Sequence, residues 1–152
     1  NKVLGKTSRD IPSMLDYKIH IEKDSMFNTP PVFPIYVSML NLQWLKKNGG
    51  INWIEKVNKR KALKLYQEID RNKLFEGLAN INDRSIMNAT FKLKNNKHQE
   101  RFDLMCVKKG INGLKGHRSV GGYRASMYNA LKEESIDVLI EIMQQIEKEN
   151  ND

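Results

Sequence analysis

The chain has 152 residues, of which 39% are hydrophobic and 29% charged, as in an ordinary globular protein that can bury one core. No run of about 18 or more apolar residues occurs, which excludes a transmembrane helix, and the first residues lack the apolar stretch of a signal peptide. The formal net charge of +8 indicates an anionic partner: nucleic acid, a membrane surface or small anions. The missing initiator methionine suggests that the chain begins within a longer protein.

Residues 1–30 are expected to be extended or looped. Apolar and polar residues alternate over 17–22, a pattern typical of a strand. A helix is then predicted with Thr29 as its N-cap and Pro30 at its first helical position. The glycine pair 49–50 should end it, after two lysines placed where the helix dipole favours cations.

Hydrophobic periodicity predicts the remaining elements. In chain order they are a helix over 52–70, a polar connection over 71–84, a strand over 87–93, a helix over 97–109, a short strand over 111–114, a strand over 123–128 and a helix over 133–149. The last helix has the clearest apolar stripe. Helices covering one small sheet predict an α/β architecture with an α+β-like small domain.

The first candidate binding motif is Phe27–Pro31. A helix N-terminus favours anions because its first amides lack partners, but the two prolines here remove some of these donors. The side chains of Asn28 and Thr29 are then the groups able to hydrogen-bond an oxyanion. The alternative is an ordinary capped helix start after a turn.

The second candidate is the glycine-rich segment Gly116–Arg124, which contains His117, Arg118 and Arg124. Guanidinium groups bind phosphate and carboxylate through two parallel hydrogen bonds, and glycines let the backbone approach a ligand closely. These three side chains would suit a ligand that carries a phosphate and a separate carboxylate. The alternative is a surface turn whose arginines bind nothing.

The densest positive charge is the run Lys56–Lys64, in which Lys56, Arg60 and Lys64 share one helical stripe. This pattern is typical of a solvated helix face, and the alternative is a basic nucleic-acid-binding module. Few aromatic residues interleave with these cations, so stacking of single-stranded nucleic acid is poorly supported.

Other chemistry finds little support in the sequence. Cys106 lies on an apolar helical stripe, as a small core residue does. A lone cysteine cannot form an internal disulfide, and it favours a reducing cytoplasm. His20 and His98 have no partners at metal-ligand spacing, so no metal site is expected.

Four segments nevertheless form a specific combination: Ser25–Pro31, Asp70–Asn72, Arg84–Asn88 and Lys115–Ala130. With the strings FNTPP and GHRSVGG in this order, the chain resembles the phosphoserine aminotransferase family of fold-type I, pyridoxal-phosphate-dependent enzymes. The likeness covers residues 12–147. It implies that the chain is the C-terminal part of such an enzyme.

The resemblance implies amino-group transfer between glutamate and 3-phosphohydroxypyruvate, giving O-phosphoserine and 2-oxoglutarate in serine biosynthesis, with pyridoxal 5'-phosphate as cofactor. Asn28 and Thr29 would contact the cofactor phosphate in the partner subunit of a homodimer. His117 and Arg118 would bind the substrate phosphate, and Arg124 the substrate α-carboxylate.

The resemblance also implies how the chain divides. Residues 1–30 would be the incomplete end of the large cofactor domain, 31–50 a connecting helix and 51–152 the C-terminal small domain. In this family the lysine that forms the Schiff base lies before FNTPP, beyond the first residue here. No catalytic residue is therefore expected in the chain, which alone should be inactive.

Overall fold

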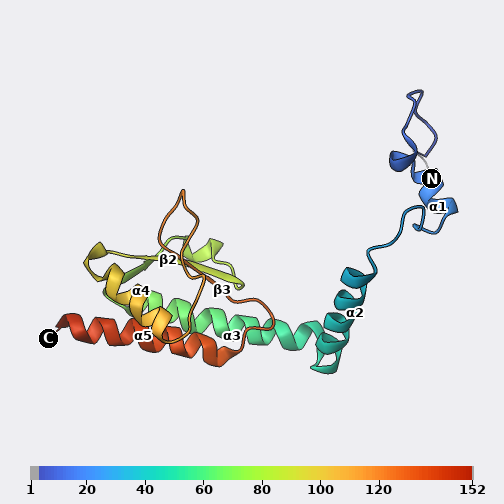
Figure 1. Cartoon of the computed structure of the whole chain (residues 1–152). Helices are drawn as coiled ribbons and strands as arrows, with labels where there is room; N and C mark the ends of the chain where they lie inside the picture. The colour runs from blue at the N-terminus through green and yellow to red at the C-terminus, as the bar shows by residue number, and fades with distance from the viewer. Residues whose placement is uncertain (1–3, 152) are drawn as a thin grey trace. The chain divides into compact units, whose positions relative to one another are not determined.

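The computed structural model describes residues 4–151, which divide between residues 47 and 48 into two compact units, called the N-terminal unit and the C-terminal unit below (Figure 1). The N-terminal unit contains the helices α1 (Tyr17–Glu22) and α2 (Val32–Lys47). Within residues 4–151, no helix is both long enough and apolar enough to cross a membrane.

The strand predicted over 17–22 is wrong, because these residues form helix α1. The Asp16 carboxylate caps the helix by accepting a hydrogen bond of 2.9 Å from the Lys18 N–H. An alternation over only six residues is a weak signal for a strand. Within residues 4–47 the structure has no strand with which residues 17–22 could pair. The local cap therefore decides the conformation.

Helix α2 begins later than predicted, at Val32. Its first α-helical hydrogen bond runs from the Ile35 N–H to the Pro31 carbonyl oxygen, at 3.2 Å. A residue that precedes a proline is disfavoured in the helical conformation, so Pro30 stays outside the helix because Pro31 follows it. The helix ends at Lys47, before the glycine pair, as predicted.

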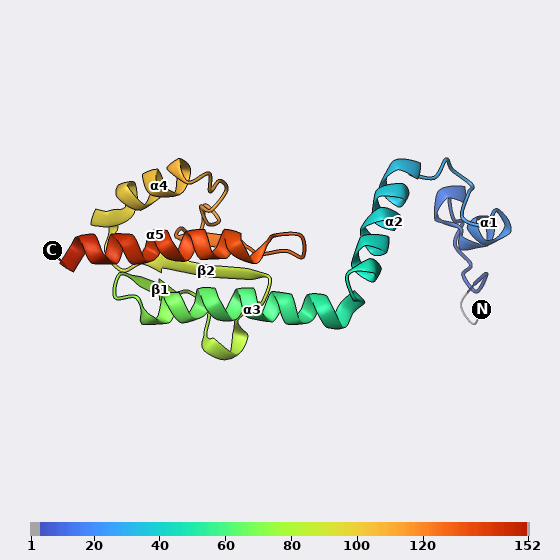
Figure 2. The ribbon, with the colours of Figure 1, turned by 90° about the horizontal axis from the view of Figure 1, so that it is seen from below.

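The C-terminal unit is a three-stranded antiparallel sheet covered on one face by helices, which confirms the predicted fold class. Strand order is β1-β2-β3. Helices α3 and α5 lie side by side against the sheet, with α4 next to α5 (Figure 2). The bounds of these elements are α3 Gly50–Arg71, β1 Phe75–Gly77, β2 Asn88–Leu93, α4 Gln99–Lys108, β3 Tyr123–Ser126 and α5 Glu133–Asn151.

Two short segments differ from expectation. Strand β1 lies inside the predicted polar connection 71–84 and is only three residues long, too short for a visible alternation. It exists because Phe75 pairs with Leu93 of β2. The strand predicted over 111–114 is wrong: the segment is irregular, since Gly113 has a φ of +72°, which interrupts an extended run.

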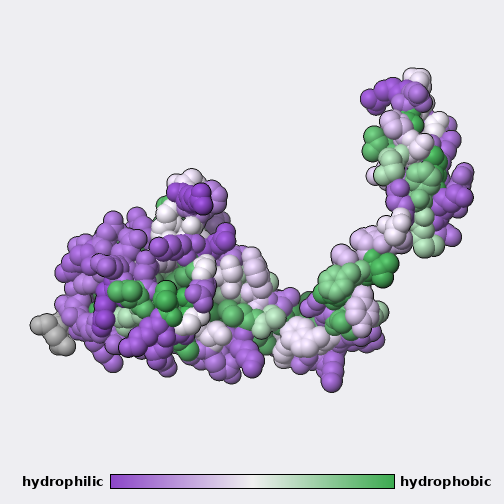
Figure 3. Space-filling model, in the orientation of Figure 1, coloured by the Kyte–Doolittle hydropathy of each residue, from purple (hydrophilic) through white to green (hydrophobic). Residues whose placement is uncertain are grey.

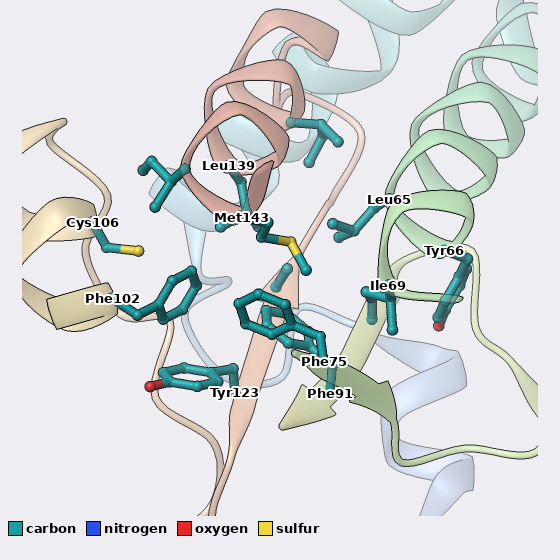
Figure 4. Packing of buried hydrophobic residues seen from close by; sticks show 14 of the residues in the cluster. Leu65, Tyr66, Ile69, Phe75, Phe91, Phe102, Cys106, Tyr123, Leu139 and Met143 are labelled. Atoms are coloured by element: carbon teal, nitrogen blue, oxygen red, sulfur yellow. The ribbon is translucent and has the colours of Figure 1, made fainter. Parts of the chain in front are cut away.

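The core of the C-terminal unit is built around four aromatic rings (Figure 4). Phe91 of the central strand lies 5.9 Å from Phe75 and 5.4 Å from Tyr123, measured between ring centroids. Phe102 of α4 lies 5.2 Å from Phe75 and 4.9 Å from Tyr123. All four residues are at most 4% exposed. The sheet and α4 are therefore joined through one continuous ring cluster.

A buried polar network joins the end of α3 to α5. Both Glu68 and Glu147 accept hydrogen bonds from the Arg71 guanidinium, and Glu147 also accepts one of 2.7 Å from the Lys73 N–H. Asn72, 1% exposed, donates to Glu68 and to the Met143 carbonyl oxygen. Each buried carboxylate is thus satisfied by donors from the α3 terminus.

Acid is expected to destabilise the protein through Glu147. Burial alone would raise its pKa, but the hydrogen bonds from the Lys73 N–H and the Arg71 guanidinium together lower the pKa by more, so it lies below the ordinary value of a glutamate. A depressed pKa stabilises the fold above the unfolded-state value, and this stability is lost as the pH falls through the folded-state pKa.

Glu147→Gln should therefore lower the free energy of unfolding by about 1–3 kcal/mol at pH 7 and reduce its pH dependence below about pH 5. Urea unfolding across this pH range measures both effects. Glu141→Gln, an exposed position on the same helix, is the control. The same pH profile in both variants would contradict this role of Glu147.

Candidate functional site

The first candidate site consists of the loop Gly116–Gly122, called the anion loop below, and the strand β3 that follows it. The Gly116 N–H donates to the Gly122 carbonyl oxygen at 2.8 Å, and Lys115 pairs with Tyr123 as an isolated bridge. At the tip of the loop, the N–H groups of Val120 and Gly121 both donate hydrogen bonds to the His117 carbonyl oxygen. The loop is therefore closed at its base and turned tightly at its tip.

Two glycines of the anion loop are required by close backbone contacts. A Cβ atom on Gly116 would collide with the Gly121 carbonyl oxygen. Gly122 has a φ of +63°, and a Cβ atom there would lie 2.7 Å from the Phe91 carbonyl oxygen. Any side chain at these positions would displace the backbone, so Gly116 is required by closure of the loop on itself and Gly122 by its packing against β2.

The imidazole of His117 is oriented by Ser119. His117 Nδ1 lies 2.8 Å from Ser119 Oγ and accepts the Ser119 N–H at 3.3 Å. A ring nitrogen that accepts an N–H carries no proton, which places the proton of the neutral ring on Nε2. His117 and the adjacent Arg118 are both exposed at the loop tip, so each presents an N–H donor to solvent.

Arg124 lies on the face of β3 that points away from the helices, since Tyr123 and Ala125 on either side are buried. It stands opposite Thr90 in the sheet register, and its N–H donates a hydrogen bond of 2.7 Å to the Leu114 carbonyl oxygen. A pocket of about 330 Å³ borders this strand. Its lining includes Arg124, Ser126, Lys109, Asn112, Leu131 and Ser135.

The three predicted anion-binding side chains, His117, Arg118 and Arg124, thus occur on one loop and the strand that leaves it. Asn28 and Thr29 belong to the N-terminal unit, where both are exposed just before α2. The Asn28 amide donates to the Met14 thioether sulfur at 3.3 Å, a weak acceptor.

The basic run on α3 is not a uniformly solvated face. Lys64 forms ion pairs with Glu133 and Asp137 of α5, and Arg60 also pairs with Glu133. Lys61 is fully buried. These pairings neutralise most of the stripe that a nucleic-acid-binding helix would need, and they weaken that alternative.

Asp103 is a residue of the site that the sequence did not predict. Its carboxylate accepts a hydrogen bond of 2.9 Å from the Tyr123 hydroxyl and lies 3.7 Å from Lys115 Nζ. No local pattern marks this residue, because its partner Tyr123 lies 20 residues further along the chain. Only the packing of α4 against the sheet brings the two together.

Residues 2–139 match the family described as Aminotransferase class-V. Proteins named phosphoserine aminotransferase are similar to the chain: the one from Flavobacterium psychrophilum is 64% identical over 146 residues, and the one from Bacteroides thetaiotaomicron is 53% identical over 150. These alignments cover 96% and 97% of this chain but 41% and 42% of the relatives. The chain therefore spans about two fifths of their length.

Solved structures show the same likeness. The phosphoserine aminotransferase from Bacillus circulans subsp. alkalophilus is 35% identical, with a TM-score of 0.87, over 98% of this chain and 42% of that chain. A phosphoserine aminotransferase studied for radiation damage of its Schiff base is 42% identical, with a TM-score of 0.85, over 93% of this chain and 40% of that chain.

Proposed function

Since the chain belongs to the class-V aminotransferase family, we propose that it is the C-terminal part of a phosphoserine aminotransferase. The intact enzyme would transfer an amino group between glutamate and 3-phosphohydroxypyruvate, giving O-phosphoserine and 2-oxoglutarate in serine biosynthesis. One observation carries this proposal beyond the family. It is the closed glycine loop with His117 and Arg118 at its exposed tip, followed on the open face of β3 by Arg124.

Each end of such a substrate has a matching group in this arrangement. His117 and Arg118 would bind the phosphate, and Arg124 the α-carboxylate. Charge-assisted hydrogen bonds from a guanidinium suit both oxyanions. A substrate without the phosphate would leave the loop donors unpaired once water is excluded, and this penalty would provide specificity.

Asn28 and Thr29 would bind the phosphate of pyridoxal 5'-phosphate held by the partner subunit of a homodimer. Their amide and hydroxyl groups are suitable donors, and an oxyanion is a better acceptor than the thioether that Asn28 contacts. When bound, the cofactor carries the amino group and withdraws electrons from the substrate α-carbon. The lysine that binds it covalently would be supplied outside this chain, so the chain alone would be inactive.

The N-terminal unit would join the large domain, with residues 1–30 as its last part and 31–50 as a connecting helix to the small domain, 51–152. Exposed apolar side chains on α2 support this division (Figure 3). Phe33 is 76% exposed and Leu42 66%, and no residue of α2 is buried. The intact enzyme would work in the cytoplasm, where the thiol of Cys106 stays reduced.

Substitution of the two arginines in the intact aminotransferase tests the proposal. Arg124→Ala should lower kcat/KM for glutamate and O-phosphoserine alike, by about 100-fold, because both carry an α-carboxylate. Arg118→Ala should lower kcat/KM for O-phosphoserine more than for glutamate. Steady-state kinetics with each substrate measures both effects.

Arg101→Ala serves as the control, because this arginine lies on α4 with its side chain 57% exposed and pairs with Glu149. Its kinetics should be those of the unmodified enzyme. Equal losses for the two substrates in Arg118→Ala would refute the assignment of the phosphate to the loop.

A further inference from the structure

We propose that Asp103 of α4 is a positioning residue that holds the base of the anion loop, chiefly through Tyr123, and thereby orients the phosphate-binding side chains of the loop. The functional part of this inference depends on the function proposed above. The structural part, that Asp103 fixes the loop, can be tested without it.

The geometry places one carboxylate across the base of the loop. Asp103 Oδ1 accepts the Tyr123 hydroxyl at 2.9 Å, while Oδ2 lies 3.7 Å from Lys115 Nζ. Lys115 and Tyr123 are the residues directly before and after the anion loop, and they pair with each other. A single side chain from a neighbouring helix therefore contacts both ends of the loop.

The two contacts differ in strength. The Lys115 side chain is 80% exposed, so its pairing with Asp103 is screened by water and contributes little. Tyr123 is 4% exposed, and its ring packs against Phe91 and Phe102. Burial raises the pKa of the Tyr123 hydroxyl, and the hydrogen bond to Asp103 raises it to a smaller extent. The hydroxyl therefore keeps its proton and remains a donor. The tyrosine contact is the stronger of the two.

Anchoring at the stems matters because of how the tip is built. The bonds from Val120 and Gly121 to the His117 carbonyl oxygen fix the shape of the tip, but all three residues lie within the loop itself. Its orientation on the domain is set where the stems join the sheet and α4. A loop held in one orientation loses less conformational entropy when it binds an anion.

Amide hydrogen exchange in the intact aminotransferase tests the structural part. Asp103→Ala and Tyr123→Phe should speed exchange of the Gly116, Val120 and Gly121 amides about fivefold, the factor that corresponds to losing one ordinary hydrogen bond. Asp103→Asn keeps an oxygen that accepts the Tyr123 hydroxyl, so it should restore most of the protection. Glu100→Ala, an exposed position one turn earlier on α4, should leave exchange unchanged.

Steady-state kinetics tests the functional part. In Asp103→Ala the KM for O-phosphoserine should rise about fivefold while kcat changes less than about twofold, because the loop binds the substrate and takes no part in the bond changes. In Asp103→Asn the KM should return most of the way to that of the unmodified enzyme. A general loss of folding would instead lower the active fraction and hence kcat.

Two results would overturn the inference. One is equal loop exchange in Asp103→Ala and Glu100→Ala. The other is faster loop exchange with an unchanged KM, in an enzyme whose KM does respond to Arg118→Ala. If Arg118→Ala also leaves the KM unchanged, the proposed phosphate site fails, and the exchange data alone still decide whether Asp103 holds the loop.

Discussion

Lys61→Met is expected to lower the free energy of unfolding by about 3 kcal/mol or more. Lysine is rarely buried, yet Lys61 is 0% exposed and its ammonium group donates to three backbone carbonyl oxygens after β3. These are the oxygens of Met127, Tyr128 and Leu131, at 3.1, 2.8 and 3.0 Å. Methionine fills a similar volume but donates no hydrogen bond, so it leaves these acceptors unpaired.

Lys59→Met is the matched control, since the Lys59 side chain is 63% exposed and forms an ion pair with Glu55, one helical turn away on the same helix. Its effect should stay within about 0.5 kcal/mol. Urea unfolding followed by circular dichroism gives both values. If the two variants were equally stable, the three carbonyl contacts would contribute nothing that water cannot replace.

Phe91→Ala is expected to cost about 3–5 kcal/mol, the range measured for large-to-small substitutions in protein cores. Phe91 is 0% exposed at the centre of the sheet and contacts two further rings of the core. Its loss would leave a cavity below Tyr123, whose hydroxyl is fixed by Asp103. A domain with a total stability of about 5–15 kcal/mol would lose about a fifth of it or more.

Leu104→Ala, at a position on α4 that is 60% exposed, provides the comparison and should cost about 0.5 kcal/mol or less. The difference between the variants measures the core contribution by urea unfolding at neutral pH. A cost below about 1 kcal/mol for Phe91→Ala would show that the ring cluster closes around the missing side chain, contrary to the expectation of tight packing.

The sequence predicted well those elements whose signals are local. Helices α3 and α5 follow from apolar stripes at helical spacing, and β2 from strict alternation over 87–93. The candidate anion loop was also recognisable, because glycines and arginines within one short segment carry their chemistry with them. The end of α2 before its glycine pair belongs to the same class of local signal.

Errors arose where a short segment depends on its neighbours. Residues 17–22 alternate like a strand, but the cap from Asp16 makes them helical. Conversely, β1 has almost no alternation and becomes a strand only because β2 lies beside it. A strand is stabilised by hydrogen bonds to another segment, which a single stretch of sequence does not display.

The sequence by itself therefore determined helices α3, α4 and α5, the central strand, the glycine pattern of the anion loop and the kinds of side chain that could bind an anion. Only the tertiary structure decided that Lys61 is buried beneath the turn after β3 and that Asp103 contacts both residues that flank the loop. The physical reason is chain distance. Periodicity, capping and backbone preference act over a few residues, whereas these two contacts join positions 66 and 20 residues apart, which meet only when α3, α4 and the sheet share one core.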